Sequence, residues 1–235
     1  MTARLRGMIT ASFSFCLIAA AQNSPAMVWS AAVGSGLARL GVLYPSDVIT
    51  AATSDGAGNI YLTGLTTRQG PAQPFVTKLS PDGQQGVYVS ILASPNVADP
   101  PVSVSVDANG EALVALKSGV LTKIGPEGDG VVFSVSFAGG ILGAVDALGD
   151  SYVLSPNSIS RVWRNGAVLW TRTFVNNPAF ARTVLAFDPD GSAVTAGTAC
   201  PPAAIAAPGV AGGFQTAPAG GCDILIELRS TKTKY

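Results

Sequence analysis

A short turn motif that recurs along the chain constrains the fold more than any other feature of the sequence. It has the form Asp-x-x-Gly, and its first residues lie 52, 39 and 42 positions apart, at Asp55–Gly58, Asp107–Gly110, Asp146–Gly149 and Asp188–Gly191. One such motif indicates only a tight turn, because Asp hydrogen-bonds to nearby backbone and Gly accepts a positive φ. Four motifs spaced near 40 residues indicate a repeated supersecondary unit.

The segments on either side of these turns are typical of β-strands. In the first unit, Val48–Ala52 precedes the turn and Asn59–Gly64 follows it, and the other units have comparable flanks. The first three units then continue with a strand that has a cation near its centre, a hairpin turn and an aromatic-bearing strand; the cations are Lys78, Lys123 and Arg161. One unit is therefore predicted to be a four-stranded antiparallel meander.

The size and composition of this unit favour a β-propeller. Four strands in about 40 residues match one propeller blade. First strands rich in small residues suit a crowded axis, and bulky last strands fill the widening gaps between blades; the last strands contain Tyr88, Phe133, Phe137, Trp170 and Phe174. We predict an all-β fold, a β-propeller of about four four-stranded blades, at about 46–92, 100–138, 140–175 and 182–229. An open or truncated propeller arc is the alternative.

The fourth unit contains no sequence typical of a fourth strand after its third. An isolated segment before the first unit, residues 27–33, resembles 168–174, the last strand of the third unit. We expect residues 27–33 to pair with 223–229 as the outermost strand of the fourth blade. This pairing would close the ring and cover an exposed sheet edge.

Two stretches of the first unit resemble the SBBP repeats of bacterial β-propellers, a family common in exported proteins. They are DGAGNIYLTG, from Asp55 to Gly64, and FVTKLSPDG, from Phe75 to Gly83. The fourth unit is similar to the family at 208–216 and 221–228, although Glu227 replaces the usual Lys. The resemblance covers roughly residues 27–229 and implies a propeller fold and an exported location. It implies no catalytic residue.

The amino terminus has the features of a secretory signal peptide. Arg4 and Arg6 precede an uncharged run that ends in three alanines at Ala21, and this run is shorter than the roughly 20 residues of a membrane-spanning helix. We expect 1–21 to be removed, leaving 22–235 as one propeller domain, secreted or periplasmic and without a transmembrane anchor. A buried amino-terminal helix is the alternative.

Composition excludes several functions. The chain has no histidine, which removes Ser-His-Asp and Cys-His catalysis and histidine-ligated metals. Its 14 basic and 14 acidic residues balance, so a nucleic-acid partner has no electrostatic basis. We expect no cofactor.

Three sets of residues are candidate sites. Cys200 and Cys222, the two cysteines left after signal removal, are predicted to form a disulfide, with two free thiols as the alternative. The turn residues (Asp55, Gly58, Asp107, Gly110, Asp146, Gly149, Asp188 and Gly191) are interpreted as structural, with calcium binding as the alternative. The equivalent cations Lys78, Lys123 and Arg161 could bind an anion, but we expect solvated or snorkelling side chains, because Glu227 interrupts the series.

The function favoured by these observations is an exported, non-catalytic binding or interaction module with an unknown protein or glycan partner. A degenerate or truncated propeller without retained activity is the first alternative. A propeller-based lyase or glycosidase that uses carboxylates or lysine is the second.

Overall fold

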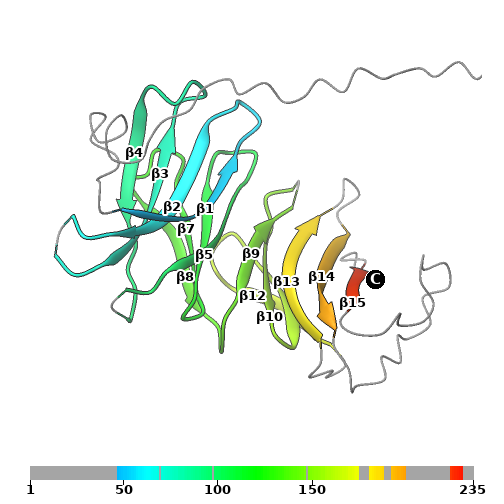
Figure 1. Cartoon of the computed structure of the whole chain (residues 1–235). Helices are drawn as coiled ribbons and strands as arrows, with labels where there is room; N and C mark the ends of the chain where they lie inside the picture. The colour runs from blue at the N-terminus through cyan, green and yellow to red at the C-terminus, as the bar shows by residue number, and fades with distance from the viewer. Residues whose placement is uncertain are drawn as a thin grey trace, which may run out of the picture. The chain divides into compact units, whose positions relative to one another are not determined.

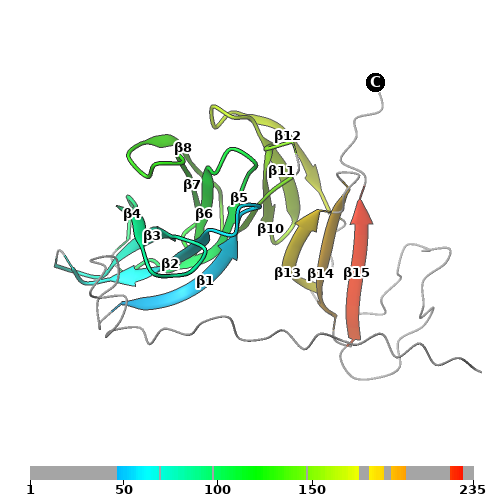
Figure 2. The same cartoon turned by 90° about the horizontal axis from the view of Figure 1, so that it is seen from above.

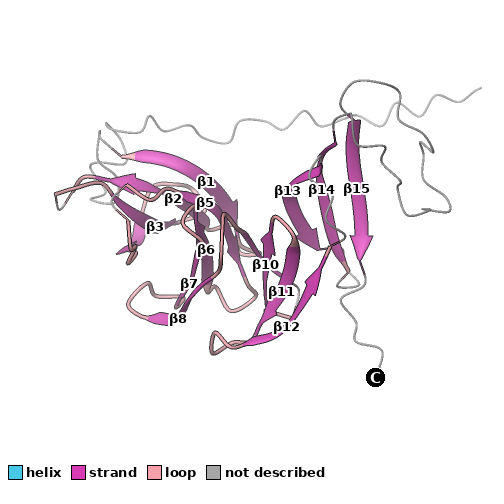
Figure 3. Ribbon diagram, turned by 90° about the horizontal axis from the view of Figure 1, so that it is seen from below, coloured by secondary structure: helices cyan, strands magenta, loops and turns pink. Residues whose placement is uncertain are grey.

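A computed structural model describes residues 47–68, 70–96, 98–146, 148–174, 180–187, 192–199 and 223–229, all within one structural unit, Ala31–Tyr235. Every regular element in these residues is a β-strand, as Figure 3 shows. The predicted all-β class is therefore confirmed for the described part of the chain. None of the described residues belongs to a helix that is long and apolar enough to cross a membrane.

The strands form four antiparallel sheets that follow chain order (Figure 1), and within each sheet every strand pairs with the next one in the sequence. The first sheet contains β1 to β4 (Val48–Ser54, Ile60–Thr66, Gln73–Leu79 and Gly86–Ile91). The second contains β5 to β8 (Pro101–Val106, Ala112–Leu116, Val120–Ile124 and Val131–Ser136). The third contains β9 to β12 (Leu142–Val145, Ser151–Ser155, Ser158–Val162 and Val168–Thr173). The fourth contains β13 to β15 (Phe180–Phe187, Ala193–Ala199 and Asp223–Arg229).

Irregularities in strand pairing recur at equivalent places in the sheets. Between the third and fourth strands, the register shifts immediately after each of the three aligned cations, Lys78, Lys123 and Arg161. The first strands of the first, second and fourth sheets also contain a register shift near their start. A bulge adds one residue and locally increases strand twist. Repetition of these shifts indicates that the sheets are copies of one structural unit.

The first strands of the four sheets lie beside one another: β1 contacts β5, β5 contacts β9, and β9 contacts β13 (Figures 1 and 2). Among the described residues, three hydrophobic clusters combine residues of consecutive sheets, and a fourth consists of residues of the first sheet alone. Tyr61 and Tyr88 of the first sheet pack with Val104 and Val114 of the second, and Phe133 packs with Val153 of the third. The core between the third and fourth sheets includes Tyr152, Phe174, Ala193 and Phe187. Large residues of the outer strands therefore fill the space between sheets, as predicted.

Several sequence predictions lie outside the described residues. These are the signal segment 1–21, the closing segment 27–33, the turn 188–191, and the two cysteines at positions 200 and 222. Within the described residues, the fourth sheet has three strands and β15 lies at its edge.

Candidate functional site

The aspartates of the first three turn motifs hold the turns in which they lie. In each one, Oδ1 accepts hydrogen bonds from the backbone N–H groups two and four residues later, over distances of 2.9–3.1 Å. The glycine at the end of each turn has a φ between 80° and 84°; these glycines are Gly58, Gly110 and Gly149. The motif thus combines an acceptor for turn N–H groups with a residue that tolerates the left-handed backbone.

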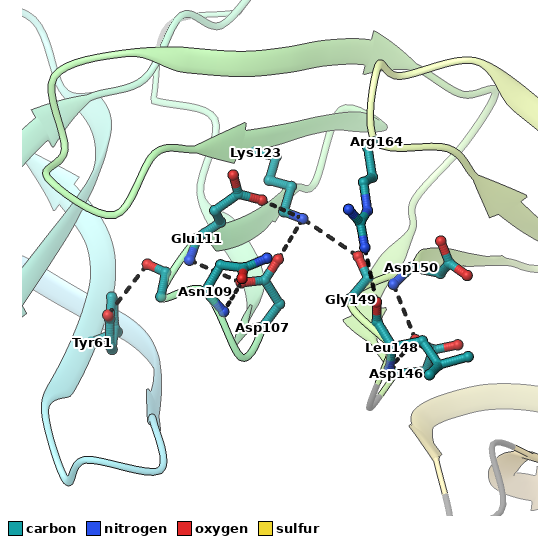
Figure 4. A network of polar contacts seen from close by, with 11 residues as sticks. Tyr61, Asp107, Asn109, Glu111, Lys123, Asp146, Leu148, Gly149, Asp150 and Arg164 are labelled. Carbon is teal, nitrogen blue, oxygen red and sulfur yellow. Dashed lines mark hydrogen bonds and ion pairs between the residues drawn. The ribbon is translucent and has the colours of Figure 1, made fainter.

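The second carboxylate oxygen of Asp107 belongs to a buried ion-pair network (Figure 4). Lys123 Nζ lies 2.7 Å from Asp107 Oδ2 and 2.8 Å from Glu111 Oε2, and the side chains of Lys123 and Asp107 are each 1% exposed. Burial by itself would raise the pKa of Asp107. The hydrogen bonds from Lys123 and from the Glu111 and Asn109 N–H groups outweigh this effect and hold the pKa below its ordinary value.

The same network joins consecutive sheets. Lys123 Nζ also donates to the carbonyl of Gly149, in the first turn of the third sheet, at 3.5 Å. One sheet earlier, the Tyr61 hydroxyl lies 3.4 Å from the carbonyl of Gly110, the equivalent glycine of the second sheet, and 3.2 Å from Asp55 Oδ2. Burial, followed by the nearby Asp55 carboxylate, raises the pKa of Tyr61 above its ordinary value. Polar groups at this end of the sheets therefore bind the first sheet to the second and the second to the third.

Our expectation of solvated or snorkelling cations is wrong for Lys123, which is buried and paired with two carboxylates. Arg161 hydrogen-bonds to Asp150 and forms an ion pair with it, whereas Lys78 lies 5.4 Å from the centre of the Tyr61 ring. The cations do occupy equivalent strand positions, since each lies opposite an outer-strand aromatic residue. The partners of these three cations lie in the same sheet as the cation or in the adjacent turn of the next sheet. The equivalent position in β15 is Glu227, opposite Thr195.

A depression of about 280 Å³ lies between the first strands of all four sheets. Its lining is neutral and consists of small apolar and hydroxyl-bearing residues: Ala51, Ala52, Val102, Ser103, Val104, Leu142, Gly143, Thr183, Val184 and Leu185. The lining reflects the small-residue composition of the first strands, a composition already noted in the sequence.

A second pocket, of about 340 Å³, lies at the opposite end of the first sheet from the Asp55 turn. It is formed by the loop before β3 and the segment after β4, and we call it the loop-end pocket; its lining residues are Pro71, Ala72, Gln73, Pro74, Leu92, Ala93, Ser94, Pro95 and Asn96. In a meander, these two connections lie at the same end, so the topology places them together. Prolines restrict both segments, because each fixes φ near −65°.

Two irregular features distinguish the loop-end pocket. The Oε1 atom of Gln73 is buried, and no described residue offers it a hydrogen bond. Ala98, just beyond the lining segment, has a φ of 54°, and its N–H donates to the Ala72 carbonyl at 3.0 Å. Unpaired buried polar atoms and left-handed non-glycine residues are both uncommon and gather at functional sites.

A buried carboxylate fixes the segment that carries these features. Asp99 is 4% exposed. Its Oδ2 accepts from Ser94 Oγ at 2.7 Å, and its Oδ1 accepts from the backbone N–H of Ser118 at 2.9 Å. The pocket wall is thereby tied to the β6–β7 turn of the second sheet.

Sequence reasoning did not find the loop-end pocket. The available signal was the concentration of prolines on both sides of the β3–β4 hairpin, at Pro71, Pro74 and Pro95. Nothing in the sequence places these two loops beside each other until the strand order is known.

The described residues contain no group of three or more His, Cys, Asp or Glu side chains placed to hold a metal ion. The described turn aspartates considered for calcium, Asp55, Asp107 and Asp146, lie in turns of separate sheets, and the Oδ1 atom of each accepts hydrogen bonds from turn N–H groups.

No protein-family model matches the sequence, and no curated protein matches it. Solved structures do match the fold. The WD40 repeats of RRP9 have a TM-score of 0.50 at 13% identity, over 65% of this chain and 46% of that one. A catalytically inactive virginiamycin B lyase from Staphylococcus aureus with quinupristin has a TM-score of 0.49 at 12% identity, over 63% of this chain and 48% of that one. A protein of unknown function from Bacteroides caccae has a TM-score of 0.44 at 16% identity, over 66% of this chain and 54% of that one.

WD40 repeats form propellers in which each blade is a four-stranded sheet. The likeness to RRP9 identifies the sheets of this chain as blades of the β-propeller type. The chain spans about half the length of the solved structures it matches. At these identities the likeness concerns the fold alone.

Proposed function

We propose that this chain is an exported, non-catalytic β-propeller module that binds a protein or glycan partner through its loop-end pocket. The observation that carries the proposal is a neutral cavity framed by prolines, whose lining includes the polar residues Gln73, Ser94 and Asn96. The prolines hold the lining before a ligand arrives, which reduces the entropic cost of binding.

The location of the ionisable groups favours binding over catalysis. Catalytic acids and bases must face the substrate, as the paired carboxylates of glycosidases do. In this chain Lys123 forms ion pairs with Asp107 and Glu111, and Arg161 forms one with Asp150. Neutral side chains line both cavities described above.

Membership of the SBBP family forms part of the proposal. The two stretches that resemble the family become neighbouring strands, β2 and β3, and their aromatic and basic positions, Tyr61 and Lys78, lie opposite each other. This arrangement gives the spacing of the motif a physical reason, since the cation covers the ring. Export is proposed from the amino-terminal sequence, and fractionation of the producing cell tests it: the cleaved chain is expected outside the cytoplasm.

Ring closure by residues 27–33 is likewise proposed. The edge of β15 would receive this segment as a fourth strand, and the closed sheet would then match the other three in strand number. Hydrogen exchange tests the pairing, because paired amides in 27–33 exchange slowly and depend on an intact β15. Rapid exchange throughout 27–33 would favour the open arc.

The binding proposal is tested by placing the exported protein on arrays of glycans and cell-envelope components. We expect binding that is lost in Gln73→Leu and retained in Gln84→Leu, a control in the exposed β3–β4 turn. Absence of binding to every component would favour the degenerate propeller. Cleavage of an arrayed glycan would favour the lyase or glycosidase.

A further inference from the structure

The exposed apolar side chains are unevenly distributed over the described residues. Apart from valines, the large apolar side chains exposed there are Leu148, Trp163 and Leu169, which are 74%, 45% and 48% exposed. All three belong to the third sheet: Leu148 to the β9–β10 turn, Trp163 to the β11–β12 turn, and Leu169 to β12, where it follows the exposed Val168. A single exposed apolar residue needs no explanation, but a group of them marks an interaction surface.

These residues share one end of the third sheet. In an antiparallel meander, the β9–β10 and β11–β12 turns lie at the same end. Arg164 connects the two turns, because its Nη2 atom donates to the Leu148 carbonyl at 3.4 Å (Figure 4). The Trp163 N–H donates to the Ala167 carbonyl at 2.8 Å, which places the tryptophan beside the start of β12. We call this surface the third-sheet tip; its residues are Leu148, Trp163, Arg164, Val168 and Leu169.

The repeated unit provides an internal comparison for the third-sheet tip. In each of the first three sheets, the glycine N–H of the last turn donates to the carbonyl three residues earlier, so these turns can be aligned. The three residues before this glycine are Trp-Arg-Asn at 163–165, Ser-Pro-Asp at 80–82 and Gly-Pro-Glu at 125–127. Leu148 likewise corresponds to Ala57 and Asn109 of the earlier Asp-x-x-Gly turns. The turns therefore form without a large apolar or basic side chain, and the third sheet has both for another reason.

The charge at this end of the third sheet favours an anionic partner. Arg164 is exposed, and its turn lacks the exposed acidic residue of the equivalent turns. The carboxylates of the neighbouring turn, Asp146 and Asp150, are buried, and Asp150 forms an ion pair with Arg161. Residues 151–187 contain four arginines and no acidic residue. The guanidinium of Arg164 is thus available to a phosphate group, which it can bind through two N–H groups.

We propose that the third-sheet tip docks on the surface of an anionic lipid bilayer. Tryptophan and arginine suit the headgroup region, because the indole needs both apolar and polar surroundings and the guanidinium binds lipid phosphates. The side chains of Leu148, Val168 and Leu169 would enter the apolar boundary beneath the headgroups. This inference goes beyond the proposed binding function and concerns a different sheet.

The same residues favour a bilayer over a glycan or a protein. A glycan presents hydroxyl groups, and these do not replace water well around the aliphatic side chains of Leu148 and Leu169. A protein partner would need a fitted pocket for a side chain as exposed as Leu148. A fluid lipid layer covers such a side chain without a fitted pocket, and its anionic headgroups complement Arg164.

Co-sedimentation of the exported protein with lipid vesicles tests the inference. The vesicles contain equal parts of phosphatidylglycerol and phosphatidylcholine, and vesicles of phosphatidylcholine alone are the comparison. We expect binding to the anionic vesicles that is about tenfold weaker in Trp163→Ser, because the indole is no longer buried in lipid. Arg164→Gln should weaken it about fivefold, because one phosphate attraction is lost. Binding should shift the tryptophan emission to shorter wavelength in the unaltered protein and not in Trp163→Ser.

The repeat supplies variants and a control that keep the fold. Serine stands at the position of Trp163 in the first sheet, and asparagine stands at the position of Leu148 in the second, so Trp163→Ser and Leu148→Asn introduce residues that this unit already contains. Val131→Ser removes a side chain that is 61% exposed in the second sheet, and it should leave vesicle binding unchanged. Thermal unfolding curves establish that each variant is folded.

Several outcomes would overturn the inference. These are equal binding to the neutral vesicles, binding that Trp163→Ser leaves unchanged, and an equal loss in Val131→Ser. Absence of vesicle binding would overturn it as well; if Trp163→Ser then reduced self-association in sedimentation, the third-sheet tip would serve a second copy of the chain instead. The proposed function of the loop-end pocket is tested separately on arrays, and its result does not depend on these outcomes.

Discussion

The ring of Tyr88, in the outer strand of the first sheet, lies directly against Gly128, in the last turn of the second sheet. A Cβ atom added to Gly128 would lie 2.3 Å from Cγ of the tyrosine, and the glycine has a φ of 74°. The next pair of sheets repeats this relationship, because a Cβ on Gly166 would lie 2.9 Å from Cβ of Phe133. Glycine is therefore required in these turns both for backbone conformation and for close packing between sheets.

Gly128→Ala is expected to destabilise the protein by about 2–4 kcal/mol, because it combines a strained left-handed residue with overpacking against Tyr88. Urea unfolding measures the loss. Gly130→Ala is the control in the same hairpin, since a methyl group at that position would have no neighbour within 4 Å; a similar loss in both variants would contradict the role of the ring contact.

Lys123→Met is expected to destabilise the protein by about 3–5 kcal/mol, because it leaves the buried carboxylate of Asp107 without its counterion. Lys78→Met, at the equivalent position of the first sheet, removes only a cation near a ring and should cost about 1 kcal/mol or less. Chemical denaturation measures both losses of stability. Equal losses in the two variants would show that the ion pair of Lys123 with Asp107 makes no specific contribution to stability.

Stability is expected to fall as the pH drops below about 4. The pKa values of Asp55 and Asp107 are lowered from 3.8 in the folded protein, so the unfolded chain binds more protons in acid. The contribution of these two carboxylates to stability is complete when the pH is above their pKa in the unfolded chain. It is lost as the pH falls through their pKa in the folded protein. Unfolding free energies measured between pH 3 and pH 7 should show this slope, and it should be shallower in Asp107→Asn, which is also less stable at neutral pH.

Ala98→Gly is expected to stabilise the protein by about 0.5–1 kcal/mol, because glycine relieves the left-handed strain at φ 54° by more than it adds chain entropy. A higher melting temperature checks this. Ala93→Gly, in the same connection but with an ordinary φ, should be neutral or destabilising, and a matching gain there would contradict the strain argument.

Cys200 and Cys222 are expected to be joined by a disulfide in the exported protein. Ala199 pairs with Asp223, and these residues directly adjoin the two cysteines in the sequence. A bridge closing a loop of about 22 residues should stabilise the protein by roughly 3 kcal/mol. Mass spectrometry of the unreduced, alkylated protein decides the matter, and two alkylated thiols would refute the bridge.

Much of the fold could be predicted because the local signals agree with one another. The turn motifs at Asp55, Asp107 and Asp146 and the cations at Lys78 and Lys123 recur at fixed places in the unit, and the strands follow them closely. Each single signal is weak, but repetition compensates for this weakness. A turn motif that appears four times allows the segments between its copies to be aligned position by position.

The site could not be predicted in the same way. Burial of Lys123 depends on the third sheet, whose Gly149 carbonyl approaches the amine, and sequence spacing contains no information on that approach. The loop-end pocket depends on two connections that a hairpin separates in the sequence. Their proximity follows from the order of the strands, and neither connection contains a sequence signal for the other.

Contacts between side chains and the turn glycines of a neighbouring sheet run in one direction along the chain. Tyr61 and Tyr88 reach turn glycines of the second sheet, and Lys123 and Phe133 reach those of the third. At both of these interfaces the earlier sheet supplies the side chains and the later sheet supplies the turn glycines, so the row of sheets has a direction, as a polar polymer does. Loss or duplication of a whole blade would place the same two complementary surfaces against each other again. The number of blades can therefore change during evolution without a new type of interface.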